Sequence, residues 1–246
     1  MAKLSNKTAL VTGGSRGIGA GIAKRLAADG AAVAITYTSS PDAANAVVRE
    51  IEAAGGKAIA FKADAGNAEA VTSAVEQTVE AFGALDILVN NAGTAFPKPF
   101  VDSTLEELDR VIDINIRGVF VATKAALKHL RDGGRIINIG SCVGERMMTP
   151  GLVPYSATKG AVKMFTQGLS REVADRGITV NNVQPGPIDT ELNPADAAWA
   201  EPQIAATALK RFGKVEEVVA LVAFVASPEA SYITGTSLTV DGGTNA

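Results

Sequence analysis

Cysteine and histidine are almost absent. The chain of 246 residues has one of each, Cys142 and His129. A single cysteine cannot form an internal disulfide, which fits a reducing compartment. No His/Cys cluster is available for zinc, and the carboxylates do not follow the spacing of a calcium loop. A hydrolase using Cys142 as nucleophile would need His129 as its base. His129 lies in a helical stretch with charged neighbours, which favours an ordinary solvated histidine.

Long apolar runs and an excess of positive charge are also missing. No segment approaches the roughly 20 apolar residues that a membrane helix needs. The first residues, MAKLSNKTALVTGG, lack the apolar core of a secretory signal. The formal net charge is −3, and Lys and Arg are spread along the chain, which argues against general binding of nucleic acid. We therefore expect a cytoplasmic protein that binds neither membrane nor nucleic acid.

What the chain does have is a regular alternation of short runs rich in Val and Ile with longer stretches of helical periodicity. This pattern is typical of βαβ units around a parallel sheet. The strand runs are almost continuously apolar, which indicates helices on both faces. The sequence predicts one α/β domain, residues 1–246, with a doubly wound sheet. The seven expected strands are Thr8 to Thr12, Ala32 to Tyr37, Lys57 to Lys62, Leu85 to Asn90, Arg135 to Ile139, Thr179 to Gln184 and Ser237 to Val240.

Three helical stretches show an apolar face that would cover this sheet. One segment breaks the alternation: residues 185 to about 211 contain four prolines and the only tryptophan, Trp199. Loops of this length usually serve a function. We expect a lid over the site at about residues 187–211, with an ordinary surface excursion as the alternative. The apolar faces are Ile18, Ile22 and Leu26; Val47, Ile51 and Ala54; and Val215, Val218, Val219 and Val222.

A glycine-rich segment follows the first expected strand directly and leads into the first helical stretch. It reads Thr12-Gly13-Gly14-Ser15-Arg16-Gly17-Ile18-Gly19. Glycines here allow a tight turn and a close approach of the backbone to a pyrophosphate, and the helix N-terminus offers free N–H groups to the anion. Its place between strand and helix predicts a dinucleotide site.

The TGxxxGxG spacing of this segment resembles that of the short-chain dehydrogenase/reductase family, and the resemblance extends over the whole chain. Asn90-Asn91-Ala92-Gly93 matches the family's NNAG motif, and Asp64 stands where the family has an acid that contacts adenine. The resemblance implies a single Rossmann-type domain and an NADP-dependent oxidoreductase. The cofactor contacts that it implies are Gly13, Ser15, Arg16, Gly17, Ile18, Gly19, Tyr37, Thr38, Ser39, Asp64, Ala65, Asn90, Ala92, Gly93, Tyr155, Lys159, Pro185, Gly186, Ile188 and Thr190.

Cofactor choice follows from charge at the end of the second strand. A carboxylate there would bind a ribose 2′-hydroxyl and repel a 2′-phosphate. The chain instead has Tyr37-Thr38-Ser39-Ser40, whose hydroxyls can donate to phosphate, and Arg16 adds a cation in the glycine loop. The sequence predicts NADPH over NADH; the alternative is that Arg16 is a solvated loop residue.

Tyr155 and Lys159 are four residues apart at the start of a helical stretch, so both side chains project from one face. Reducing a ketone requires a proton at the oxygen while hydride arrives at the carbon. A phenol with a pKa of about 10 is a poor acid–base catalyst near neutrality in the reverse, alcohol-oxidising role. A nearby ammonium stabilises phenolate, so we expect Lys159 to lower the pKa of Tyr155.

The resemblance assigns further roles around this pair. It implies that Ser141 orients the substrate oxygen, that Lys159 also hydrogen-bonds the nicotinamide ribose, and that Asn115 seats a water linking Lys159 to solvent. The backbone of Ile188 and the side chain of Thr190 would contact the carboxamide. A regulator that keeps the fold without turnover is the alternative. The intact catalytic residues Asn115, Ser141, Tyr155 and Lys159 favour an enzyme.

Among family members, the chain is most similar to 3-oxoacyl-[acyl-carrier-protein] reductases and broad carbonyl reductases. Arg131 and Arg171 lie near positions where the former present basic residues to an acidic carrier. Leu152, however, stands where they usually have Gln. Acids in the expected lid would also repel such a carrier. We therefore predict a broader carbonyl reductase and keep the acyl-carrier enzyme as the alternative. These lid acids are Asp189, Glu191, Asp196 and Glu201.

Substrate contacts are expected from Ser141, Met147, Met148, Leu152 and Trp199. The two methionines and Leu152 would form an apolar, adaptable pocket wall, or they fill a core or an oligomer contact instead. The family resemblance also implies a homotetramer, with subunits meeting through the long helices, which include residues 110–130 and 155–176, and through the C-terminal strand.

Overall fold

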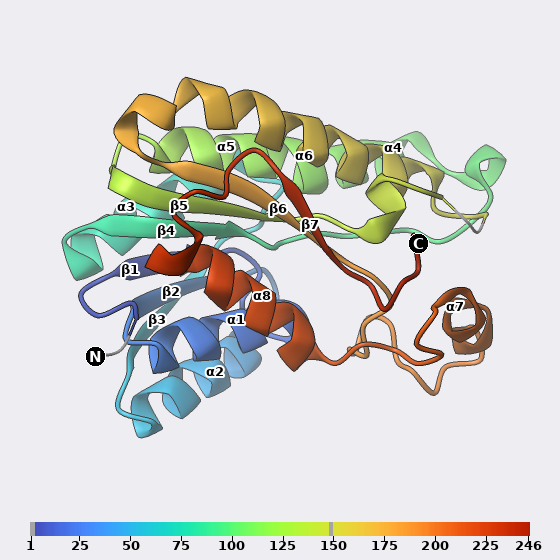
Figure 1. Cartoon of the computed structure of the whole chain (residues 1–246), viewed down its shortest axis with the longest axis horizontal. Coiled ribbons are helices and arrows are strands. Elements are labelled where there is room, and N and C mark those ends of the chain that lie inside the picture. The colour runs from blue at the N-terminus through green and yellow to red at the C-terminus, as the bar shows by residue number, and fades with distance from the viewer. Residues whose placement is uncertain (1–2, 148–149) are drawn as a thin grey trace.

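The computed structural model describes residues 3–147 and 150–246. Within these ranges seven strands form one parallel sheet in the order β3-β2-β1-β4-β5-β6-β7, which confirms the predicted doubly wound Rossmann-type fold (Figure 1). The strand order reverses between β1 and β4, which puts a switch point at the carboxyl edge of the sheet. The strands are β1 Thr8–Val11, β2 Ala32–Tyr37, β3 Lys57–Lys62, β4 Leu85–Asn90, β5 Leu130–Ile139, β6 Thr179–Pro185 and β7 Ser237–Val240.

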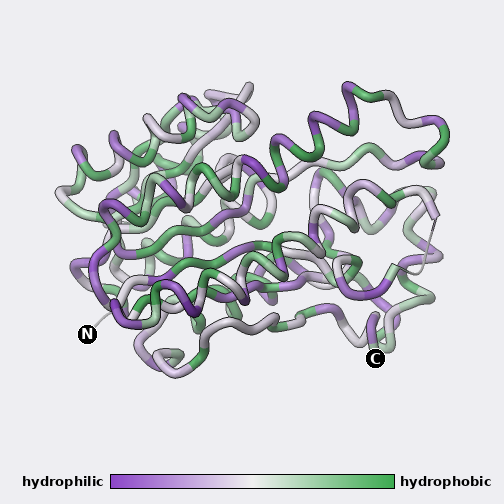
Figure 2. Tube along the Cα trace, turned by 90° about the horizontal axis from the view of Figure 1, so that it is seen from above, coloured by the Kyte–Doolittle hydropathy of each residue, from purple (hydrophilic) through white to green (hydrophobic). Residues whose placement is uncertain are grey.

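Helices cover both faces of this sheet. In Figure 1, α1, α2 and α8 lie on one side, and α3, α4, α5 and α6 lie on the other. Figure 2 shows hydrophobic and hydrophilic residues alternating along the helices, as amphipathic helices require. The helices are α1 Gly17–Ala28, α2 Pro41–Ala53, α3 Ala68–Phe82, α4 Leu105–Ile112, α5 Gly118–Ala126, α6 Val153–Glu172, α7 Ala200–Ala206 and α8 Val215–Ala226.

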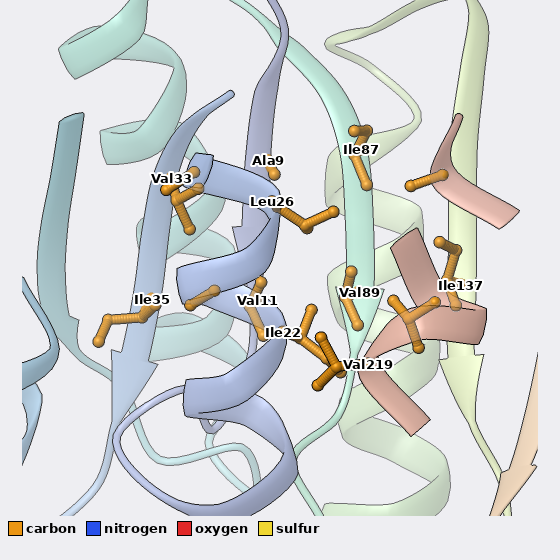
Figure 3. Close-up of a cluster of buried hydrophobic side chains, with 14 of the residues drawn as sticks. Ala9, Val11, Ile22, Leu26, Val33, Ile35, Ile87, Val89, Ile137 and Val219 are labelled. Carbon is orange, nitrogen blue, oxygen red and sulfur yellow. The ribbon is translucent and has the colours of Figure 1, made fainter. Parts of the chain in front are cut away.

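The core between the α1 face and the sheet consists of the predicted apolar faces. Ile22 and Leu26 of α1 are fully buried against strand residues such as Val33 and Ile87 (Figure 3). One predicted core residue, Ala54, is exposed, because α2 ends at Ala53 and the chain then turns away through Gly55, whose φ is +83°.

The expected lid leaves the sheet after Pro185. Its two ends meet in a parallel bridge between Ile188 and Gly213. Between them the segment forms α7 beside the carboxyl edge of the sheet (Figure 1). In the part of the chain that the structure describes, no helix is long and apolar enough to span a bilayer.

Buried amides join the two central strands near the same edge. Asn90 of β4 and Asn138 of β5 are partners in register, and Asn90 Nδ2 donates to Asn138 Oδ1 at 2.8 Å. Asn90 also donates to Thr123 of α5, while Asn138 donates to Thr166 of α6 at 2.9 Å. These bonds fix α5 and α6 to the sheet, because a buried polar group without a partner is costly.

Replacing Asn138 by Ala removes partners from Asn90 and Thr166 at once. We expect the free energy of unfolding to fall by about 2–4 kcal/mol, since buried donors and acceptors lose their bonds. Urea denaturation of this variant measures the loss. Gln77→Ala, at an exposed α3 position, is the matched control and should stay within about 0.5 kcal/mol of wild type. Equal midpoints for Asn138→Ala and wild type would contradict this role.

Candidate active site

A cleft of about 940 Å³ opens at the carboxyl edge of the sheet. Its walls come from the glycine loop after β1, the loops after β2, β4, β5 and β6, the start of α6, and the lid. A crevice beyond the carboxyl ends of parallel strands at a switch point is where doubly wound folds bind their ligands.

The glycine loop fits a dinucleotide pyrophosphate. A Cβ on Gly19 would lie 2.3 Å from the carbonyl oxygen of Gly13, and Gly13 itself has a φ of +64°. The Arg16 side chain does not cap α1, so the first amides of the helix stay available to an anion. Asn91 Nδ2 donates to the carbonyl oxygens of Thr12 and Gly13 at 2.9 and 3.0 Å, which ties the loop after β4 to the glycine loop.

At the far end of the cleft, Asp64 forms a bond that the sequence did not reveal. Arg110 of α4 donates to both carboxylate oxygens of Asp64 at 2.9 Å, and the amide of Gly66 donates to one of them. Burial alone would raise the pKa of Asp64, but these hydrogen bonds outweigh it and hold the pKa below its usual value. The two residues are 46 positions apart, and no local pattern predicts such a pairing.

The predicted cofactor residues line the cleft with one exception, Asn90. Its side chain is buried at the end of β4 and bonded to Thr123 and Asn138. The neighbouring Asn91 faces the cleft in its place. The cofactor residues that line the cleft as placed are Gly13, Ser15, Arg16, Gly17, Ile18, Gly19, Tyr37, Thr38, Ser39, Asp64, Ala65, Ala92, Gly93, Tyr155, Lys159, Pro185, Gly186, Ile188 and Thr190.

Ser141, Tyr155 and Lys159 come together on one wall. Ser141 follows β5 in extended backbone, and Tyr155 and Lys159 lie one turn apart at the start of α6. The ammonium of Lys159 lies 5.5 Å from the ring centre of Tyr155 and donates to the carbonyl oxygen of Ile139 at 2.7 Å. The Ser141 side chain also lies close enough to the Tyr155 hydroxyl to lower the pKa of Tyr155. This geometry presents a hydroxyl pair to the cleft with a cation behind it.

The pKa values of this pair differ from the sequence-based expectation. Burial raises the pKa of Tyr155 to about 12, and the nearby Ser141 side chain offsets only part of that. Burial also lowers the pKa of Lys159 to about 8. Desolvation therefore dominates over attraction between ammonium and phenolate in the protein alone. Tyr155 stays a neutral phenol near neutrality, the form that can donate a proton.

Asn115 lies behind this wall, in a π-helical turn, Asp113–Arg117, between α4 and α5. Its amide accepts from the Thr94 amide and donates to the Thr94 carbonyl, both at 2.9 Å, and it donates to Thr158 at 3.1 Å. Thr158 in turn donates to the carbonyl of Tyr155 at 2.7 Å. π-helical turns often mark functional positions, and this one ties the loop after β4 to the helix that carries Tyr155.

The residues predicted to contact substrate lie only partly in the cleft. Ser141, Leu152 and Trp199 line it. Met147 is not among the residues that line the cleft, and the two residues before it, Glu145 and Arg146, are exposed. Met148 lies outside the described residues. Sequence reasoning missed several lining residues whose chemistry is common in any loop: Thr94, Ala95, Pro97, Leu192, Pro202, Gln203, Ala206 and Thr244.

No group of three or more His, Cys, Asp or Glu side chains that could hold a metal occurs within residues 3–147 and 150–246. Cys142 is buried next to Ser141, and burial raises the pKa of its thiol to about 11. A thiol with a raised pKa is a poor nucleophile.

Comparison with known proteins gives the class. A family profile described as enoyl-(acyl carrier protein) reductase matches residues 13–245. A short-chain dehydrogenase from Burkholderia cenocepacia, solved with NADP, is 54% identical with a TM-score of 0.98, covering 99% of this chain and 100% of that one. The chain belongs to the short-chain dehydrogenase/reductase family of oxidoreductases, as the sequence motifs predicted.

Two bacterial relatives of similar identity to this chain carry different names. A 3-oxoacyl-[acyl-carrier-protein] reductase from Synechocystis sp. is 45% identical over 99% of this chain and 98% of that protein. A cyclic-di-GMP-binding biofilm dispersal mediator protein from Escherichia coli is 42% identical over 98% of each. Proteins with different named roles thus share this fold at similar identity.

Replacing Lys159 by Met is expected to stabilise the protein at pH 7 by roughly 1–3 kcal/mol while abolishing turnover. The folded-state pKa of about 8 lies below the ordinary 10.5. Below pH 8 the ammonium is charged in both states and its burial penalises the folded state. As pH rises from 8 to 10.5 the folded protein releases this proton first, so the penalty fades.

Urea denaturation of wild type and Lys159→Met at pH 7 and pH 10 measures this difference. Lys57→Met, at an exposed position that begins β3, is the control and should show no such pH-dependent gain. A Lys159→Met variant less stable than wild type at pH 7 would show that burial is not the dominant effect on Lys159.

Proposed function

We propose that the protein uses NADPH to reduce an uncharged, largely apolar ketone to a secondary alcohol. The observation that carries this is the neutral Tyr155 phenol beside Ser141, facing the same cleft as the glycine loop. The cofactor would be held by the glycine loop and the loops after β2 and β3, and when bound it supplies the hydride. The catalytic roles of Ser141, Tyr155, Lys159 and Asn115 are part of this proposal.

The protein's own residues handle the oxygen and the proton. Ser141 and Tyr155 hydroxyls would hydrogen-bond the carbonyl oxygen and so favour negative charge developing on it. Tyr155 then donates its proton to that oxygen. The Lys159 ammonium, held by Ile139, lies 5.5 Å from the Tyr155 ring centre and stabilises the phenolate left behind. The oxidation of an alcohol follows the same path in reverse.

The preference for NADPH is supported by charge at the adenosine end. Tyr37, Thr38 and Ser39 line the cleft after β2, and no carboxylate stands at that strand end. Arg16, exposed in the glycine loop, lines the same cleft. The Burkholderia relative was solved with NADP.

Arg16→Ser is expected to weaken NADPH binding about tenfold or more and to leave NADH binding almost unchanged, because a hydrogen bond to a charged group contributes about 1.5–3 kcal/mol. Fluorescence titration with both cofactors measures this. Lys57→Ser, which removes a cation at the start of β3, away from the carboxyl edge, is the matched control. An equal loss for both cofactors would show that Arg16 does not recognise the 2′-phosphate.

The substrate class follows from the lining of the cleft. Among the described lining residues, the charged ones are Arg16, Asp64, Lys159 and Glu191. The first two lie at the cofactor end, and Lys159 is engaged behind Tyr155. Pro150, Leu152, Leu192, Trp199 and Pro202 supply apolar walls. A substrate carboxylate or phosphate would find no cation at this end, so an uncharged ketone fits best.

The acyl-carrier alternative has less support from the fold. Arg131 is the second residue of β5 and Arg171 the second-last of α6, so both lie at the edge of the sheet opposite their own cleft. Arg131 also pairs with the buried Asp86 at 3.6 Å. Within one chain, a carrier bound at these arginines would be remote from Tyr155.

Wild-type protein should oxidise NADPH with aromatic or cyclic ketones at a higher kcat/KM than with an acetoacetyl thioester, measured by NADPH absorbance. Tyr155→Phe should lower kcat at least a thousandfold while NADPH binding and thermal stability are retained, since only the proton donor is lost. This variant is the control for contaminating reductases. No turnover with any ketone, or near-normal turnover of Tyr155→Phe, would favour the regulatory alternative that the Escherichia coli relative illustrates.

We also infer that the chain forms an oligomer, a tetramer as the family resemblance implies. Large apolar side chains are exposed together on the outer helices of one face, and burying them would favour association. They are Leu105 and Ile112 of α4, Phe120 of α5 and Met164 of α6. Light scattering on the purified protein gives the subunit number.

A further inference from the structure

We propose that Asn245 is a positioning residue for Ser141. The inference rests on the proposed function, because it concerns the same hydroxyl. The turn formed by residues 241–245 follows β7 and forms part of the cleft, where Thr244 is a lining residue. From this turn Asn245 reaches the backbone of the loop that carries Ser141.

The contact is made through a single peptide group. Asn245 Nδ2 donates to the carbonyl oxygen of Cys142 at 2.8 Å. The N–H of that same peptide group, which belongs to Val143, donates to Ser141 Oγ at 3.4 Å. Because a peptide group is planar and rigid, holding its carbonyl also sets the direction of its N–H. The amides of Glu145 and Arg146 also donate to this carbonyl, at 3.1 and 3.2 Å, but Asn245 makes the shortest bond and is the only side chain among the three donors. Asn245 thereby helps to fix the donor that orients the hydroxyl of Ser141, whose side chain lowers the pKa of Tyr155.

Asn245 is itself held in place. The Asp241 carboxylate accepts from the amide of Gly243 at 2.9 Å and from the amide of Asn245 at 3.0 Å. Thr244 Oγ1 donates to the carbonyl of Asp241 at 2.6 Å. The turn is therefore closed by its own hydrogen bonds, and Asn245 presents its amide with little freedom to lose on bonding Cys142.

The same turn touches two other parts of the site. The amide of Leu209, at the end of the lid, donates to the carbonyl of Gly242 at 3.0 Å. A Cβ on Gly186 would lie 2.6 Å from Asp241 Cα, so the segment after β6 also packs directly on the turn. The lid base, the Pro185–Gly186 segment and the Ser141 loop thus share one support, and Asn245 is its link to Ser141.

Asn245→Asp tests this with almost no change in shape. An ionised carboxylate cannot donate to the Cys142 carbonyl, so that carbonyl loses its shortest hydrogen bond and keeps only those from the amides of Glu145 and Arg146, at 3.1 and 3.2 Å. We expect kcat for ketone reduction to fall about fivefold to tenfold, the effect of one lost hydrogen bond, with the KM for NADPH unchanged. Asn245→Ala should show a similar fall in kcat, and it also serves if the aspartate variant does not fold.

A double-mutant cycle with Ser141→Ala separates positioning from general support. If Asn245 acts through Ser141, Asn245→Asp in the Ser141→Ala background should cause less than a twofold further loss of kcat. Gln77→Glu, an exposed amide-to-acid change on α3, is the control for added charge and should keep wild-type kcat.

Two results would overturn the inference: a full fivefold to tenfold loss that persists without the Ser141 hydroxyl, or no loss of kcat in either Asn245 variant when both fold. If Ser141→Ala alone keeps wild-type turnover, the proposed function fails, and this inference fails with it. An intact Ser141 effect with additive Asn245 loss leaves the proposed function standing and rejects only the role of Asn245.

Discussion

The arrangement of Ser141 and Tyr155 on one wall of the cleft depends on a buried charged group, the ammonium of Lys159. Lys159 is 5% exposed, and its ammonium donates to the carbonyl oxygen of Ile139, the last residue of β5. This bond joins α6 to the strand that leads to Ser141, so the helix cannot shift along the sheet without leaving a buried cation unbonded. Burying Lys159 costs stability. This cost accompanies the arrangement in which the phenol of Tyr155 and the hydroxyl of Ser141 face one cleft.

Neutral amides reinforce the same region. Asn90 and Asn138 join β4 and β5 to α5 and α6, and Asn115 joins the loop after β4 to α6 through Thr158. These bonds are directional, unlike apolar contacts, and they lie just behind the carboxyl edge of the sheet. The apolar core gives the layers their stability, and the amide hydrogen bonds determine the position of the helices relative to the strands.

The sequence predicted those parts of the fold and site that depend on neighbours along the chain. Six strands match at both ends or within one residue, because apolar runs and glycine breaks are local signals. The glycine loop and the Tyr155–Lys159 spacing were readable for the same reason. The strand β5 begins earlier than predicted, at Leu130, since its first residues include two glycines and two charges.

Contacts between distant positions escaped prediction. The pairing of Arg110 with Asp64 and of Asn245 with Cys142 depends on tertiary packing, and nothing in the neighbouring residues distinguishes these side chains. The pKa of Tyr155 was expected to fall and instead rises, because burial cannot be judged from spacing alone. Met147 was expected in the pocket but is not among the lining residues, and local sequence gives no signal for the course of the loop that carries it.

The bridge between Ile188 and Gly213 has a consequence for how such a protein can change. The amide of Asp189 donates to the Gly213 carbonyl and the amide of Gly213 to the Pro187 carbonyl, both at 2.9 Å. The segment between these residues is an excursion whose two ends are already hydrogen-bonded to each other. Lengthening or exchanging it alters loop entropy only slowly and leaves the sheet register untouched. The excursion beyond Thr190 can therefore be exchanged to fit other substrates, while the sheet and the glycine loop, which carry most of the predicted cofactor contacts, stay as they are.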